Sequence, residues 1–504
     1  MKRTIINPFA IWDNIFDKKE RMMLACLVII GLALRLINAL FTQLWRDEIY
    51  TFLNARNNSF FDLLLQQHSD PVHPPLYSIF LHFWQKIAYT PFFLRLPSLI
   101  ATLFILILIP VLAKKIYPNL KLFPVLALFF FSFSHSQISL NMVVRVYSFV
   151  ILLMIISMII FIDIVNANKI SSLKILSFSL INFISFLTDY SAIWLILSYW
   201  VFLAIYTVMF PHQKIDTKQK LFNGLMIIAI LILLFVPFLL KGVPQAAHMV
   251  KGSMEDKLKT SNQFQVALGE LSFFTGVTES DLLTSYRILD WMSWRKILIS
   301  IALVGLIMGF LKNRVNGLFL YIVLLSPLVA SFVFSLIFLP IFLGRNLHIV
   351  NLVFILGLSL FFATFFQKRI IYLSVLLFFW VINFFQAFPM LHYVEPPYDW
   401  MKLHKTIYSY PISKTKYLIT SFPSYMFKHF DYYSLFWPIE NLKIIQLDEI
   451  ASIKKDNGIV FLVYFLREKK WDVNINPYRY KLSKSFQCNP SKIDIDYIYF
   501  AECK

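Results

Sequence analysis

The chain has 504 residues, of which 58% are hydrophobic and only 15% are charged, and its formal net charge is +19. A soluble protein of this length could not bury so much apolar surface, so the composition excludes an ordinary soluble protein and indicates a membrane protein with several spans. The positive charge does not indicate nucleic-acid binding. Much of it falls in short Lys/Arg clusters between apolar runs, as in cytoplasmic loops that face anionic lipid.

The first apolar run follows a basic, aromatic N-terminal stretch and has no small-residue cleavage site after it, so we interpret it as a retained membrane anchor. Runs of roughly 20 apolar residues predict about eleven membrane spans, within a range of ten to thirteen. The predicted spans are residues 22–42, 93–113, 121–140, 146–167, 173–188, 190–210, 221–240, 294–311, 317–338, 345–366 and 370–388.

Basic residues follow every second predicted span, for example Lys114-Lys115 and Lys368-Arg369. By the positive-inside rule this pattern places the N-terminus in the cytoplasm and the C-terminal part outside a plasma membrane or bacterial inner membrane. The loops 43–92 and 241–292 are then exoplasmic. This topology requires that Pro74–Ala88 forms a short aromatic helix in the outer interface. If that segment crossed the membrane instead, the later loops would be inverted.

The composition changes at about residue 390, which divides the chain into a membrane module, residues 1–390, and an exoplasmic domain, residues 391–504. Strand-like runs in the second part alternate with helix-compatible stretches, which predicts a small α/β domain. These runs are residues 417–420, 443–447, 459–465 and 495–500. The predicted fold is therefore mainly α: a polytopic transmembrane helix bundle with exoplasmic interfacial helices and a C-terminal α/β domain.

Two cysteines, Cys488 and Cys503, lie in this predicted outer domain. The exoplasmic compartment permits oxidation, and Asn489-Pro490-Ser491 is typical of a turn. We therefore predict a hairpin in this region and a disulfide bond between the two cysteines.

The stretch Trp45-Arg46-Asp47-Glu48 comes directly after the first span. Two adjacent carboxylates at a bilayer surface, beside a tryptophan that can anchor in the interface, are costly unless they are used. The alternative is a solvated loop that only begins a helix over Glu48–Asn57. Further polar residues fall on the same predicted face: Asp70, His73, Arg95, Arg145, Asp189, Tyr190 and Arg345. Carboxylates together with arginines suit a reaction with an anionic phosphate as the leaving group.

Four motifs resemble the polyprenyl-phosphate-dependent membrane glycosyltransferases of the GT-C superfamily, which includes the protein O-mannosyltransferases and the lipid A aminoarabinose transferase. The resemblance covers about residues 20–200 and continues loosely to Arg345. The motifs are Trp45-x-Asp47-Glu48, Asp70-x-x-His73-Pro74-Pro75-Leu76-Tyr77, Leu94-Arg95-Leu96-Pro97-Ser98 and Arg145-x-Tyr147-Ser148.

The resemblance implies transfer of a sugar, with inversion, from a polyprenyl-phosphate donor to a glycan, lipid or protein acceptor on the exoplasmic side. It implies that Asp47 is the catalytic carboxylate and that Glu48 supports it. It also implies a set of substrate-binding residues, with Arg145 and Arg345 on the carrier phosphate. That set is Asp70, His73, Tyr77, Arg95, Arg145, Tyr147, Asp189, Tyr190 and Arg345.

A divalent metal ion is a further expectation from the resemblance, with Asp70, His73 and Asp189 as ligands. Two departures from the family pattern bear on these roles. No carboxylate precedes Arg145, where relatives often have one, and Asp189 stands where relatives often have a histidine. A carboxylate at position 189 remains a suitable ligand for a hard cation.

Each assignment has a simpler alternative. His73 could cap the helix that begins at Pro74-Pro75, Arg95 could extend to lipid headgroups, and Asp189 could only form the turn between two spans. At the level of function, the alternatives are a transporter or flippase of a lipid-linked or anionic substrate, and a non-catalytic envelope protein. The chain shows no paired halves and no Gly/Pro-broken spans in matching positions, as many transporters do.

Overall fold

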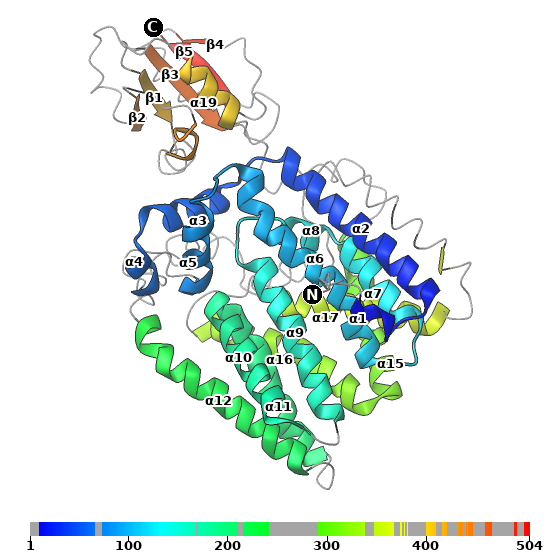
Figure 1. The fold of residues 1–504 in the computed structure, drawn as a ribbon. Helices are drawn as coiled ribbons and strands as arrows, with labels where there is room; N and C mark the ends of the chain where they lie inside the picture. Colours follow the sequence, from blue (N-terminus) through cyan, green and yellow to red (C-terminus); the bar gives the residue numbers. More distant parts are fainter. Residues whose placement is uncertain are drawn as a thin grey trace, which may run out of the picture. The chain divides into compact units, whose positions relative to one another are not determined.

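The structure is a computed structural model of the chain (Figure 1). It describes residues 10–65, 73–167, 170–209, 215–240, 291–337 and 347–366, and shorter stretches beyond them: 373–374, 377, 381, 400–409, 416–420, 431–436, 440, 442–446, 459–465, 488–490 and 498–503.

The chain divides into two compact units. The first combines Met1–Phe41 with Asn54–Leu391, and the second combines Thr42–Leu53 with His392–Lys504. The sequence predicted a single boundary near residue 390. The structure has a boundary there, but it also assigns the short segment Thr42–Leu53 to the unit that contains the C-terminal part of the chain.

The first unit is helical. Its elements are α1 (Ala10–Asp13), α2 (Lys18–Phe41), α4 (Phe60–Leu65), α5 (Pro75–Trp84), α6 (Pro91–Ile116), α7 (Leu122–Ser132), α8 (His135–Asn141), α9 (Tyr147–Asn166), α10 (Ser172–Thr188), the 3₁₀ turn η1 (Tyr190–Ala192), α11 (Ile193–Met209), α12 (Ile215–Leu240), α15 (Trp291–Lys312), α16 (Arg314–Ile337) and α17 (His348–Phe366). Helix α3 (Arg46–Asn57) begins in the second unit and ends in the first.

Six helical segments of the described part are long and apolar enough to cross a membrane, and the chain is a membrane protein. These segments are Lys18–Phe41, Pro91–Ile116, Tyr147–Asn166, Tyr190–Met209, Arg314–Phe334 and His348–Phe366. Shorter apolar helices cover Leu122–Ser132, Ser172–Thr188 and Leu298–Lys312. The total of about eleven spans and the orientation of the termini stay predictions. Most of the last predicted span, residues 370–388, and most of the loop 241–292 lie outside the described residues.

The segment predicted as an interfacial helix forms α5, which has only 10 residues and begins with Pro75 after Pro74. Ten helical residues span about 15 Å, half the thickness of the hydrocarbon core. Trp84, at the end of α5, stacks on Phe93 with the ring centroids 4.7 Å apart. Its indole nitrogen also donates to the Phe93 carbonyl oxygen at 3.0 Å. The helix is therefore fixed to the start of α6.

The predicted span 121–140 is interrupted, which corrects the expectation of one continuous helix. Helix α7 ends at Ser132, where its last carbonyl groups have no partner within the helix. The guanidinium group of Arg35 on α2, which is fully buried, donates to the carbonyl oxygens of Phe131 at 3.1 Å and Ser132 at 3.4 Å. A cation at a helix C-terminus also interacts favourably with the helix dipole. Arg35 thus stabilises the break between α7 and α8.

Close packing of helices depends on glycine where α15 meets α17. A Cβ atom on Gly305 would overlap the carbonyl oxygen of Gly357. Small residues at such contacts allow the backbones of membrane helices to approach closely. Helix α6 packs against α2, α7 and α9, and it therefore connects the first helices of the unit (Figure 1).

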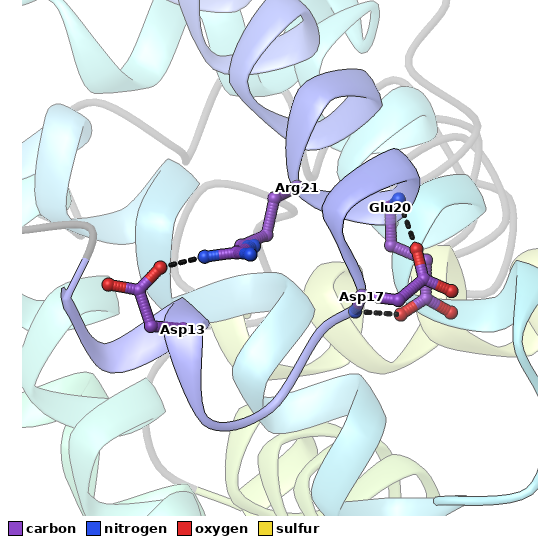
Figure 2. A network of polar contacts seen from close by, with 4 residues as sticks. All are labelled: Asp13, Asp17, Glu20 and Arg21. Atoms are coloured by element: carbon purple, nitrogen blue, oxygen red, sulfur yellow. Dashed lines mark hydrogen bonds and ion pairs between the residues drawn. The ribbon is translucent and has the colours of Figure 1, made fainter.

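A capping box begins α2 (Figure 2). Asp17 Oδ1 accepts from the backbone N–H of Glu20 at 2.8 Å, and Glu20 Oε2 accepts from the backbone N–H of Asp17 at 3.1 Å. Two backbone donors at the helix start are satisfied in this way. Arg21 also pairs with Asp13 on α1, so that the short helix α1 is joined to the first span.

The second unit contains a five-stranded mixed sheet with the strand order β2-β1-β3-β5-β4. The strands are β1 (Lys416–Thr420), β2 (Leu442–Gln446), β3 (Ile459–Phe465), β4 (Cys488–Pro490) and β5 (Ile498–Cys503), and helix α19 spans Trp400–Tyr408. Strand β1 pairs in parallel with β2 and β3, whereas β5 runs antiparallel to β3 and β4. The register of the β4–β5 pair places Cys488 opposite Cys503.

Candidate functional site

The two predicted catalytic carboxylates lie in the first turn of α3, within the second unit. Glu48 is fully buried, and its Oε2 atom accepts from the backbone N–H of Trp45, the residue that precedes the helix, at 3.0 Å. Glu48 therefore caps the helix. Asp47 is half-buried, and its carbonyl oxygen accepts from Thr51 Oγ1 at 2.8 Å. The two neighbouring carboxylates thus lie in different environments.

The loop that carries Arg145 connects α8 and α9 in the first unit, and α6 fixes its backbone. Ser98 Oγ donates to the carbonyl oxygen of Val143 at 2.7 Å, and Thr102 Oγ1 donates to that of Asn141 at 2.8 Å. Residues four apart lie on one face of a helix, so Ser98 and Thr102 act together. The motif Leu-Arg-Leu-Pro-Ser thereby positions a loop more than forty residues later in the sequence.

Arg145 and Tyr147 lie at the start of α9, where both are buried. The guanidinium carbon of Arg145 lies 5.9 Å from the ring centroid of Tyr147, which is within cation–π range. The Tyr147 ring also lies 5.0 Å from the imidazole of His348, the first residue of α17. These contacts join the beginnings of two membrane-length helices through three polar side chains.

Asp189 lies at the junction between α10 and the turn η1 and is nearly buried. Its Oδ1 atom accepts from the backbone N–H of Ser191 at 2.7 Å, so it does form the predicted turn. Its Oδ2 atom lies 3.9 Å from His73 Nδ1. His348 is in electrostatic range of both Asp189 and His73. We call His73, Arg145, Tyr147, Asp189 and His348 the polar cluster.

Other predicted residues have contacts of their own. Arg95 is buried, and its Nη1 atom donates to the carbonyl oxygen of Ala39 in the last turn of α2 at 3.2 Å. It therefore does not extend to lipid headgroups, which corrects that alternative. Tyr77 is buried with its ring 5.5 Å from that of Phe149, and Tyr190 lies 5.7 Å from the ring of Phe186. For these three residues a substrate contact stays a prediction.

Asp70 and Arg345 lie outside the described residues. Within the described part of the chain, no three His, Cys, Asp or Glu side chains gather closely enough to hold a metal ion. His73 and Asp189 supply two ligand atoms, whereas protein sites for zinc have three or four protein ligands. A metal ion at this position would therefore need Asp70 or another ligand.

Two features of this region were not predicted from the sequence. His348 is 2% exposed, and neither of its ring nitrogens has a hydrogen-bond partner among the residues that the structure describes. It lies more than 150 residues from the other members of the cluster, and nothing in the local sequence distinguishes it from a packing residue. The roles of Ser98 and Thr102 could have been predicted, because two hydroxyl groups four residues apart lie on one face of a mostly apolar helix.

No known protein family matches this sequence, and no curated protein matches it. Among solved structures, the fold is similar to the crystal structures of ArnT from Cupriavidus metallidurans, in the apo state and bound to undecaprenyl phosphate. The identity is 11% in both cases, with TM-scores of 0.43 and 0.40, and the similarity covers 95% of this chain and 97% of the other. At these values the likeness assigns no role to any residue of this chain.

Proposed function

We propose that the chain is a membrane glycosyltransferase that moves a monosaccharide from a polyprenyl-phosphate carrier to an acceptor hydroxyl, with inversion at the anomeric carbon. The acceptor is a cell-envelope glycan, a glycolipid or a protein, on the exoplasmic side of a plasma membrane or bacterial inner membrane.

The observation that carries this proposal is the polar cluster. Ionisable groups at membrane level are expensive and are functional by default. Here an arginine, a carboxylate and two histidines, all buried or nearly so, gather in a chain with only 15% charged residues. Arg145 suits a phosphate group, because its planar fork can donate two parallel hydrogen bonds to two of the phosphate oxygens.

The reaction is a single displacement. The acceptor oxygen attacks the anomeric carbon of the sugar while the bond between that carbon and the phosphate oxygen breaks. The acceptor proton passes to the Asp47 carboxylate, which acts as the general base. The phosphate leaves as an anion without needing a general acid, and Arg145, together with Arg345, stabilises its charge. Attack opposite the leaving group inverts the configuration.

Glu48 and three members of the polar cluster have supporting roles in this proposal. Glu48 holds the first turn of α3, in which Asp47 lies. His73, Tyr147 and Asp189 would contact the sugar and the acceptor. A divalent ion bound by Asp70, His73 and Asp189 also stays a proposal, and no step of the reaction described here passes through it. Dialysis of the purified protein against EDTA, followed by an activity assay, tests this proposal.

Purified protein in detergent, incubated with a panel of undecaprenyl-phosphate sugars carrying a radiolabel, tests the function. We expect release or transfer of at least one labelled sugar by the natural chain. Asp47→Asn keeps the size of the side chain and removes the base, so turnover should fall by about a hundredfold or more while the donor lipid still binds.

Asp62→Asn is the matched control. Asp62 lies in α4, where it accepts hydrogen bonds from Ser59, so its loss weakens a helix cap, and it is not a member of the polar cluster. Turnover should be normal in this variant. Normal turnover in Asp47→Asn, together with its loss in Asp70→Asn, would assign the base to Asp70. If the natural chain transfers none of the sugars, the proposed function is wrong.

A further inference from the structure

The stretch that contains Asp47 belongs to the unit formed by the C-terminal part of the chain. Residues Thr42–Leu53 form one compact unit with His392–Lys504, although more than 300 residues separate them in sequence. The unit that contains Asp47 therefore includes residues that were predicted from the sequence to form a separate outer domain.

Two contacts hold the stretch on either side of Asp47. Before it, Gln43 Oε1 accepts a hydrogen bond from Tyr433 Oη at 3.0 Å. After it, the ring of Phe52 meets the ring of Tyr432 edge to face, with the centroids 5.4 Å apart and an interplanar angle of 87°. Edge-to-face pairs are a favoured aromatic geometry. Both partners come from one short segment, 431–436, of the C-terminal part.

These contacts are buried. Phe52 and Tyr432 are each 0% exposed and Tyr433 is 3% exposed. On α3, Glu48 and Ile49 are also fully buried, so residues 48, 49 and 52 form one inward face of the helix. Successive residues of a helix are turned by about 100°. Asp47 therefore lies off this face, which agrees with its half-buried state.

We propose that Tyr432 and Tyr433 are positioning residues. They hold the buried face of α3 within the second unit and thereby fix the direction of the Asp47 side chain. This inference rests on the proposed role of Asp47. A base must lie within hydrogen-bond reach of the acceptor hydroxyl, so a small rotation of α3 lowers the rate of the chemical step without changing the affinity for the donor.

Tyr433→Phe tests the hydrogen bond to Gln43 directly, because it removes only the hydroxyl group and leaves the ring against Tyr432 and His404. We expect kcat to fall about fivefold, the factor that corresponds to one neutral hydrogen bond, with the KM for the undecaprenyl-phosphate sugar unchanged. Hydrogen exchange of the backbone amides of residues 43–53 should become faster. Gln43→Met should have the same effects, and the double variant should be no worse than either single variant.

Tyr408→Phe is the matched control, because Tyr408 lies in the same unit on α19 and is 45% exposed. Its kcat and its amide exchange should be those of the natural chain. Normal kcat and normal exchange in Tyr433→Phe would overturn the inference, and so would effects of Tyr433→Phe and Gln43→Met that simply add. A fall in kcat with a matching rise in KM would also overturn it, because this would indicate general loosening.

Failure of the proposed function gives a different result. If the natural chain transfers no sugar, the glycosyltransferase proposal fails, while the exchange measurement still reports whether Tyr433 holds the stretch. If the natural chain is active and Tyr433→Phe changes neither rate nor exchange, only the positioning role fails.

Discussion

His73 Nδ1 lies 3.9 Å from Asp189 Oδ2, and this contact joins the residue before the Pro-Pro start of α5 to the junction of α10 and η1. Asp189 uses its other carboxylate oxygen for the turn that it caps. One side chain therefore serves both the local fold and the polar cluster, and the two tasks can be separated by substitution.

Asp189→Asn keeps an oxygen for the Ser191 N–H and removes the negative charge that faces His73. We expect the melting temperature to change little, and kcat/KM for sugar transfer to fall by about tenfold or more, equivalent to 1.4 kcal/mol. Asp163→Asn is the control, because it removes the partner of Lys115 without touching the cluster. Normal activity in Asp189→Asn would reduce Asp189 to the turn that the sequence also allowed.

Arg145→Lys tests the phosphate contact. Lysine keeps the charge but loses the planar fork, so the KM for the lipid-linked donor should rise about tenfold or more while the protein folds normally. Arg56→Lys is a matched control, since Arg56 also lies over an aromatic ring, that of Tyr89, at 5.3 Å, but outside the cluster. Arg345→Lys should resemble Arg145→Lys, and normal donor use in either variant would remove that arginine from the phosphate site.

His348→Phe tests whether the buried imidazole is present for a ligand. Phenylalanine preserves the ring against Tyr147 and removes two nitrogens that have no hydrogen-bond partner in the described part of the chain. An unpaired buried polar group costs about 1–3 kcal/mol, so the melting temperature should stay the same or rise. Sugar transfer should fall by about tenfold. A melting temperature several degrees lower would instead show that His348 has a structural role.

The sequence predicted the helices well where the signal is local. Long apolar runs correspond to α2, α6, α9 and α16, and the short run after Pro74 corresponds to α5. A span needs only about 20 apolar residues in sequence, so its length can be read without knowledge of its neighbours.

Features that depend on distant partners could not be predicted in this way. The break after Ser132 depends on Arg35, which is 97 residues away, and no proline or glycine marks it. The same limit applies to the site. His348 is recognisable only through its contacts with Tyr147, Asp189 and His73. The placement of Asp47 depends on a hydrogen bond between residues 390 positions apart.

The pairing of β4 with β5 is compatible with the predicted disulfide bond between Cys488 and Cys503. Opposite residues of an antiparallel pair have Cα atoms about 4.5–5.5 Å apart, within the range that a disulfide requires. Cys488 and Cys503 are opposite in this register. We expect denatured, unreduced protein to react with one equivalent of maleimide, at the exposed Cys26, and with three equivalents after reduction. Reaction of three thiols before reduction would contradict the bond, which should contribute about 3 kcal/mol to stability.

The stability of the second unit should depend on pH through His404 on α19. Its side chain is 1% exposed, and its Nε2 atom lies 3.4 Å from Ser434 Oγ. Burial lowers the pKa of His404 from 6.5 to about 4. Between these values the unfolded chain binds a proton that the folded unit does not bind. The stability of the unit should therefore be complete above pH 6.5 and should decrease as the pH falls towards 4, by at most about 1.4 kcal/mol per pH unit.

Hydrogen exchange of the α19 amides at pH 5 and pH 7.5, corrected for the intrinsic rate, measures this effect. Burial also raises the pKa of Asp431, which adds stability as the pH falls and so has the opposite sign. His404→Phe retains Asp431 and removes the histidine. The difference between the natural chain and His404→Phe therefore isolates His404, and we expect the protection of α19 at pH 5 to be lower in the natural chain than in the variant. Equal protection in both proteins at both pH values would contradict this prediction, because it would show that folding does not change the pKa of His404.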